Sequence, residues 1–138
     1  MYVLDASFIA SLILPDEASE KAAALAEELV HEGTVAPGLL QLEVTNILLV
    51  AQRRKRIDAV QLRMLSEAFD KFPVKMQPLL TPGQRAEVMR LAQKHQLSAY
   101  DAAYLELAVR LNLPLASLDE PLRKAAKAEG IKLAIRNL

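Results

Sequence analysis

The sequence has 138 residues, 52% of them hydrophobic, which predicts a single domain over 1–138 with a substantial core, at about 150 residues per domain. Equal numbers of basic and acidic side chains, 17 of each, give a formal net charge of zero, so no overall field draws the protein to a polyanion or a membrane surface. The absence of cysteine excludes disulfides, thiolate nucleophiles and cysteine-ligated zinc, and no apolar run approaches the roughly 20 residues that span a bilayer, so we expect a cytoplasmic protein with no membrane contact.

Short β-prone segments are separated by amphipathic helices along the chain. In chain order, the patterns predict a strand at 2–4, helices at 7–14 and 18–32, a strand at 34–36, helices at 39–54 and 58–72, a strand at 73–76, helices at 81–95 and 99–111, a strand at 114–118, a helix at 119–129 and a strand at 131–134. Gly33 ends the second helix, and Asp58 and Ser98 are typical N-caps. Strands separated by helices predict an α/β fold, in which a short parallel sheet of about four or five strands lies between helical layers.

Two predicted helices carry an acid on an apolar face. Glu43 shares its face with Ile47, and Asp101 shares its face with Tyr104. Burying an ionised acid without a partner costs several kcal/mol, so each acid needs a cation, a hydrogen-bond network or a position at the rim. Alternatively, Glu43 lies at the edge of the apolar stripe of its helix and pairs with a neighbouring lysine or arginine. The alternative for Asp101 is a capping box with Ser98, three residues earlier.

Two further acids follow predicted strands. Asp5 and Asp119 can each be explained as a helix N-cap. In an open parallel sheet, however, the carboxyl ends of strands and the amino ends of the next helices converge on one crevice. Because Asp5, Asp101 and Asp119 occupy such places and Glu43 points inward, we expect four acids in one cleft. Like charges at that density raise one another's pKa values unless a divalent cation neutralises them, and oxygen ligands favour Mg²⁺ or Mn²⁺.

An acidic site without a cysteine, histidine or lysine nucleophile predicts phosphoryl chemistry. One or two Mg²⁺ or Mn²⁺ ions would lower the pKa of an attacking water and offset the charge on phosphorus. The two histidines, His31 and His95, lie near predicted helix ends, where an imidazolium favours the helix dipole, and neither adjoins the acids. A Ser-His-Asp triad built on Ser7 is therefore not expected.

Four segments, in this order and spacing, resemble the PIN-domain endoribonucleases, and most closely the VapC-type toxins of bacterial and archaeal toxin–antitoxin modules. They are Val3–Ser7, Glu43–Leu48, Ser98–Tyr104 and Leu115–Leu122. The resemblance implies a PIN-like three-layer α/β/α fold, an RNA substrate and a cognate antitoxin. The catalytic and metal-binding acids that it implies are Asp5, Glu43, Asp101 and Asp119. The residues that it implies orient ligands or substrate are Ser7, Asn46 and Ser117.

Two positions depart from the family pattern. Ser117 stands where threonine is more common, which keeps the hydroxyl group. Pro121 stands where some relatives have a further acid, two positions after Asp119. A second metal ion would therefore be held loosely, and one-metal and two-metal mechanisms both stay open.

Arg53, Arg54, Lys55 and Arg56 form the one dense basic run of the sequence. It is either a solvated helix C-terminus, whose cations favour the helix dipole, or an edge that contacts RNA phosphates or an acidic partner. With a net charge of zero a monomer would hold RNA weakly, so we expect a homodimer that aligns two such runs.

Two other function classes each require an aspartate at one position where this sequence has a different residue. A haloacid-dehalogenase-like phosphatase needs an aspartate where Ser7 stands, and a receiver domain needs a phosphoacceptor aspartate after the third strand, where the chain has Gln77 and Pro78. The main alternative is a PIN-fold module that binds RNA or protein without catalysis. Binding of Mn²⁺ would discriminate between that module and an enzyme.

Overall fold

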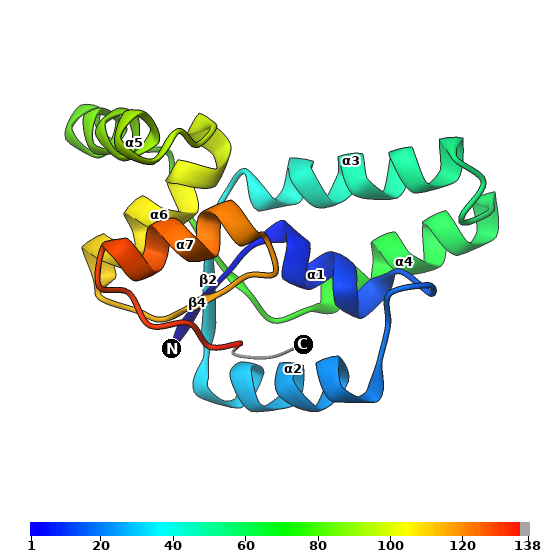
Figure 1. The fold of residues 1–138 in the computed structure, drawn as a ribbon. Coiled ribbons are helices and arrows are strands. Elements are labelled where there is room, and N and C mark those ends of the chain that lie inside the picture. The colour runs from blue at the N-terminus through cyan, green and yellow to red at the C-terminus, as the bar shows by residue number, and fades with distance from the viewer. Residues whose placement is uncertain (136–138) are drawn as a thin grey trace.

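The computed structural model describes residues 1–135 (Figure 1). The strands are β1 (Tyr2–Leu4), β2 (Thr34–Pro37), β3 (Lys75–Gln77) and β4 (Leu115–Ala116). The helices are α1 (Ala6–Ile13), α2 (Glu20–Glu32), α3 (Leu40–Arg53), α4 (Ala59–Lys71), α5 (Pro82–His95), α6 (Ala99–Leu111) and α7 (Glu120–Ala128). Within the described range, no helix is both long enough and apolar enough to cross a membrane.

The strands form one parallel sheet in the order β3-β2-β1-β4. β1 is an inner strand, because Val3 pairs with Val35 of β2 on one side and with Leu115 of β4 on the other. Since all the strands run in one direction, their carboxyl ends meet at one edge of the sheet. Asp5 directly follows β1 at that edge, and Ser117 directly follows β4.

Helices lie on two sides of the sheet. Figure 1 shows the sheet between α5, α6 and α7 at the left and α1 to α4 at the right. α6 packs on β1 and β2 and contacts α5 and α7, whereas α1 contacts α2, α3 and α4. Fully buried side chains from both groups and from the sheet form one core, which includes Phe8, Leu40, Leu91, Tyr104 and Leu122. The predicted three-layer α/β/α architecture is confirmed.

Local signals explain most helix ends. Asp58 begins α4 with a capping box, in which its carboxylate accepts from the Gln61 N–H at 2.8 Å and the Gln61 side chain accepts from the Asp58 N–H at 2.9 Å. Gly33 ends α2 with a φ angle of 100°, a conformation that side chains with a Cβ rarely adopt. Such signals depend on neighbours in sequence, which is why the predicted helix bounds agree with the observed ones to within about two residues.

Three predicted strands differ from the structure, and the one predicted at 114–118 is shortened to β4 (Leu115–Ala116). The strand predicted at 131–134 is wrong: this segment makes only a single bridge, between Leu133 and Leu115. The Leu115 N–H donates to the Lys132 carbonyl, and the Ala134 N–H donates to the Leu115 carbonyl, both at 2.9 Å. β4 is only two residues long, so the segment at 131–134 cannot form a longer run of strand hydrogen bonds with it. The strand predicted at 73–76 is observed two residues later, as β3.

Candidate active site

Asp5 lies at the carboxyl edge of the sheet and begins α1. Its Oδ1 accepts from the Phe8 N–H at 3.0 Å and from the Ser7 hydroxyl at 2.7 Å, and its Oδ2 accepts from the Ser117 hydroxyl. The N-cap explanation is therefore correct for one bond, but the carboxylate does more than cap. It connects the end of β1 to the end of β4.

Burial dominates the electrostatics of Asp5, which is only 4% exposed. Loss of solvation raises the pKa of Asp5 to about 6, although hydrogen bonds from Ser117, Ser7 and the Phe8 N–H work in the opposite direction. The nearby negative charge of Asp119 raises this pKa further. Asp5 and Asp119 are therefore electrostatic neighbours.

Ser7 and Ser117 hold the loop that carries Asp119. Their hydroxyl oxygens lie 3.4 Å apart. The Ser7 oxygen accepts from the Leu118 N–H at 2.9 Å, and the Ser117 oxygen accepts from the Asp119 N–H at 3.0 Å. Asp119 is in turn the N-cap of α7, where its carboxylate accepts from the Leu122 N–H at 3.0 Å. The two serines thus fix the position of Asp119 relative to Asp5.

Glu43 lies in the first turn of α3 and is held by a tyrosine of α6. The Tyr104 hydroxyl donates to Glu43 Oε1 at 2.5 Å, and Tyr104 itself is only 1% exposed. The buried stripe of α3 includes Val44 and Leu48, so it is displaced by one residue from the predicted face. Glu43 is therefore half-buried at the rim, with a hydrogen-bond partner instead of a basic neighbour. Burial raises the pKa of Glu43 against the effect of the Tyr104 hydrogen bond, and the charge of Asp101 adds to the rise.

Asp101 lies in the first turn of α6, and it interacts electrostatically with Glu43 and Asp119. The Ser98 hydroxyl accepts from the Asp101 N–H at 3.1 Å, but no reciprocal bond from the Ser98 N–H completes a capping box in the residues described. Burial raises the pKa of Asp101, and the charge of Asp119 raises it further. The pKa of Tyr104 is also raised, by burial, by its bond to Glu43 and by the charges of Asp5 and Asp101. Tyr104 therefore stays a neutral hydrogen-bond donor among the carboxylates.

The chemistry of this group of acids fits a hard divalent cation. Every potential metal ligand is a carboxylate oxygen, and a bound cation would offset the neighbouring negative charges that oppose ionisation of each acid. As they stand, however, no three acidic or histidine side chains between residues 1 and 135 are arranged so that they could hold a metal ion. The oxygens of Asp5 and Oε1 of Glu43 instead accept hydrogen bonds from Ser7, Ser117 and Tyr104. Bringing the acids onto one ion requires side-chain rotations.

Other predicted contact residues lie apart from the acids. Asn46 is exposed, and within the described range no hydrogen bond joins it to them. The basic run lies at the opposite end of α3, about 15 Å along the helix from Glu43 at about 1.5 Å per residue. Its last member, Arg56, forms ion pairs with Asp16 at 2.8 Å and Glu17 at 2.9 Å. Arg53, Arg54 and Lys55 are exposed there.

Two contributors to this region cannot be identified from the sequence pattern. The pattern indicates Tyr104 only as an apolar neighbour of Asp101, because its bond to Glu43 depends on how α3 and α6 pack. Arg123 of α7 donates to the carbonyl oxygens of Ser117 at 2.9 Å and Ile135 at 2.7 Å. It thereby ties the end of β4 to the segment that follows α7. An arginine in an exposed-looking helix gave no sequence signal for this role.

Comparison with known proteins identifies the family. The family model for the PIN domain matches residues 2–128. The chain is 36% identical over 126 residues to Ribonuclease VapC3 of Pyrobaculum aerophilum, an alignment that covers 87% of this chain and 90% of that protein. The crystal structure of PAE2754 from Pyrobaculum aerophilum superposes with a TM-score of 0.70, at 26% identity over 96% of this chain and 83% of that one. FitAcB from Neisseria gonorrhoeae shares the fold, with a TM-score of 0.64 at 16% identity over 96% of both chains. The chain therefore belongs to the PIN-domain family, among its VapC-type members.

Proposed function

We propose that this protein is a metal-dependent endoribonuclease that hydrolyses phosphodiester bonds of RNA, and that residues 1–138 form one PIN-like domain. The observation that carries the proposal is the raised pKa of Asp5, Glu43 and Asp101 at one edge of the sheet. Such perturbed carboxylates are typical of functional sites, because a fold gains nothing in stability by burying them together. The similarity to a protein named as a ribonuclease supports RNA as the substrate class.

The metal ligands in this proposal are Asp5, Glu43, Asp101 and Asp119, and the ion is Mg²⁺ or Mn²⁺ because all the donors are carboxylate oxygens. When bound, such an ion supplies activation of water and neutralisation of phosphate charge. The protein's own residues prepare the site. Ser7 and Ser117 hold Asp5 and the Asp119 loop in place, and Tyr104 holds Glu43. With a pKa of about 6, Asp5 is mostly ionised at neutral pH and available as a ligand.

Cleavage of RNA tests this proposal directly. Purified protein with Mg²⁺ or Mn²⁺ should cut a structured RNA, EDTA should stop the reaction, and Asp101→Asn should abolish it. Asp58→Asn, which alters an exposed cap far along the chain from the acids, serves as the matched control and should cleave as the wild type does. Cleavage that continues in EDTA, or that survives Asp101→Asn, contradicts a carboxylate-bound metal.

We further propose that the protein acts as the toxin of a toxin–antitoxin pair and forms a homodimer. Membership of the VapC-type group supports an antitoxin partner, and the acids favour a partner segment that offers a cation. Expression of the protein alone should arrest growth, and co-expression of its antitoxin should relieve the arrest. Normal growth with abundant active nuclease would contradict the toxin role alone. Sedimentation of the purified protein as a monomer would contradict the homodimer.

A further inference from the structure

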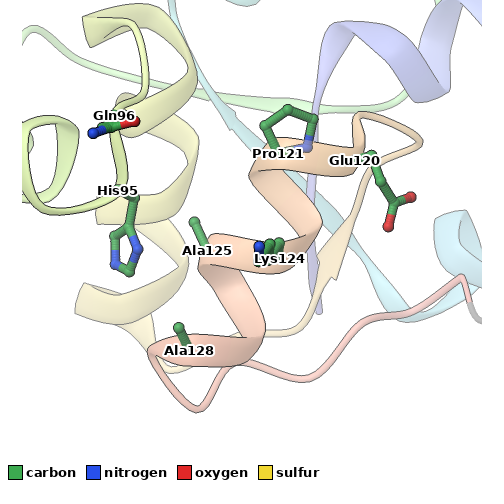
Figure 2. A pocket seen from close by; sticks show the side chains of 7 residues that line it. All are labelled: His95, Gln96, Glu120, Pro121, Lys124, Ala125 and Ala128. Carbon is green, nitrogen blue, oxygen red and sulfur yellow. The ribbon is translucent and has the colours of Figure 1, made fainter.

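A groove of about 500 Å³ separates the end of α5 from α7. Figure 2 shows His95 and Gln96 on one side of it and α7, with Pro121 and Lys124, on the other. We call it the α5–α7 groove. Its size is typical of pockets that hold small organic ligands. It was not predicted from the sequence, because it is formed by two helices that are far apart along the chain.

One end of the α5–α7 groove is lined by the residues that directly follow Asp119. Pro121, which lines it, is the second residue after Asp119, the N-cap of α7. From there the groove follows α7 away from the sheet edge. Lys124 lies five residues after Asp119, which is about 7.5 Å along the helix axis at about 1.5 Å per residue. A ligand in the groove would therefore extend toward a group bound at Asp119.

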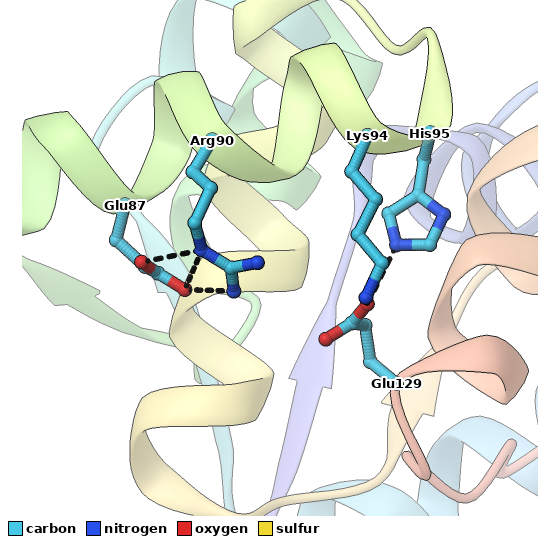
Figure 3. A network of polar contacts seen from close by, with 5 residues as sticks. All are labelled: Glu87, Arg90, Lys94, His95 and Glu129. Atoms are coloured by element: carbon cyan, nitrogen blue, oxygen red, sulfur yellow. Dashed lines mark hydrogen bonds and ion pairs between the residues drawn. The ribbon is translucent and has the colours of Figure 1, made fainter.

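Beside the groove, ion pairs join the end of α5 to the end of α7 (Figure 3). Glu129 Oε2 lies 2.7 Å from Lys94 Nζ and 2.7 Å from His95 Nε2, so it connects the end of α5 to the end of α7. These two basic neighbours lower the pKa of Glu129, chiefly through their hydrogen bonds. The charge of Lys94 is therefore already matched, and the His95 ring is fixed as a wall of the groove.

Lys124 is the cation that the groove leaves available. It is exposed, and it forms no ion pair with any residue in the described part of the chain. The other charged side chain of the lining, Glu120, points away from His95 and Gln96 in Figure 2, and its carboxylate lies 3.6 Å from Arg123 Nε. The groove thus presents one positive charge and one side-chain amide, that of Gln96.

We propose that the α5–α7 groove holds the RNA strand next to the bond that is cut, with Lys124 contacting a backbone phosphate and Gln96 a neighbouring polar group of the nucleotide. The inference rests on the proposed ribonuclease function and names where the substrate runs. Ala125 and Ala128 line the α5–α7 groove and offer no surface for base stacking. Contacts here are therefore with phosphate and sugar and carry little sequence information. A peptide that brings a cation to the acids would meet like charge at Lys124, so a polyanion fits the groove better.

The test measures binding separately from cleavage. Every protein carries Asp101→Asn and contains Mg²⁺, so that RNA is bound without being cut, and a short fluorescein-labelled single-stranded RNA is titrated by anisotropy. Lys124→Gln should weaken binding roughly threefold, by the same factor for two unrelated sequences. It should also make the slope of log affinity against log salt less negative by about 0.7, the value for one phosphate contact to a single strand.

Two further variants make the test specific. Lys127→Gln removes the same charge from the same helix, but Lys127 lines a different pocket with Arg123, so the slope should stay that of the parent protein. Ala128→Lys adds a cation inside the groove, one helical turn from Lys124, and should make the slope more negative by about 0.7.

Equal effects of Lys124→Gln and Lys127→Gln would overturn the inference, because they would reflect overall charge. No effect of Lys124→Gln on a protein that binds RNA would also overturn it, would leave the ribonuclease proposal intact, and would point to a protein segment as the occupant of the groove. A parent protein that binds no RNA at all would instead refute the proposed function.

Discussion

Replacing Asp5 by asparagine should make the metal-free protein more stable at neutral pH. The Asp5 carboxyl has a pKa of about 6 in the folded protein, compared with 3.8 for an unburied aspartate, because burial disfavours the charged form. Between these two values the folded state binds more protons than the unfolded state, so the free energy of unfolding falls as pH rises. The difference of about 2.2 corresponds to about 3 kcal/mol at about 1.4 kcal/mol per pKa unit. This loss of about 3 kcal/mol in the free energy of unfolding is absent below pH 3.8 and complete above about pH 6.

Asparagine keeps the shape and the cap but cannot ionise. Its amide group loses the bond that the Ser117 hydroxyl donates to Asp5, at a cost of about 1 kcal/mol, so the net gain at neutral pH is about 2 kcal/mol. For a chain of this length that gain raises the melting temperature by about 6–8 °C. Below about pH 4.5 the order reverses and the variant becomes slightly the less stable protein.

Urea unfolding followed by circular dichroism, in EDTA and across this pH range, measures the difference between variant and wild type. Taking the difference removes the contributions of acids that do not interact with Asp5. Asp58→Asn is the matched control, because Asp58 is also an N-cap but is exposed, and its curve should run parallel to that of the wild type. An Asp5→Asn variant that is less stable by a constant amount at every pH would refute the reasoning, since Asp5 would then be an ordinary ionised cap.

Further outcomes concern the other members of the site. Mn²⁺ should stabilise the wild type by about 2.7 kcal/mol at a hundredfold excess over its dissociation constant, and Glu43→Gln should lose most of this gain while its metal-free melting temperature stays equal or rises. A wild-type melting temperature that ignores Mn²⁺ would argue against the metal site. Tyr104→Phe removes the donor to Glu43 and should lower the free energy of unfolding in urea by about 1–2 kcal/mol, whereas Tyr100→Phe, an exposed change on the same helix, should stay within about 0.5 kcal/mol. Asp119→Ala should cost about 0.5–2 kcal/mol in thermal unfolding and Asp119→Asn almost nothing, and a large loss with asparagine would show that the charge itself supports the fold.

The helices and most strands could be predicted because their boundaries are set locally. Gly33 ends a helix through its own backbone, and Asp58 begins one through a bond to a residue three positions later. The segment at 131–134 is different, because whether it becomes a strand depends on how much of β4 is available to pair with it. Nothing in its own residues contains that information.

The acids of the candidate site could be proposed from the sequence because parallel strands bring their carboxyl ends together whatever the loops contain. Their partners could not. The bond from Tyr104 to Glu43 depends on the rotation of two helices about their axes, and the predicted stripe of α3 was displaced by one residue. The contact of Arg123 with the Ser117 carbonyl likewise depends on how α7 lies over the end of β4.

The inner position of β1 has a consequence for synthesis on the ribosome. β1 leaves the ribosome before the other strands of the sheet, yet one of its two neighbours, β4, is made more than a hundred residues later. Pairing across such a separation closes a long loop, so it comes late in folding. Only when this pairing is complete does the Ser117 hydroxyl donate to Asp5 and does Asp119 take its position near Asp5. A nascent or prematurely terminated chain that ends before β4 therefore carries Asp5 without Ser117 and Asp119, and the cell that makes the protein meets an assembled site only when translation has passed residue 119.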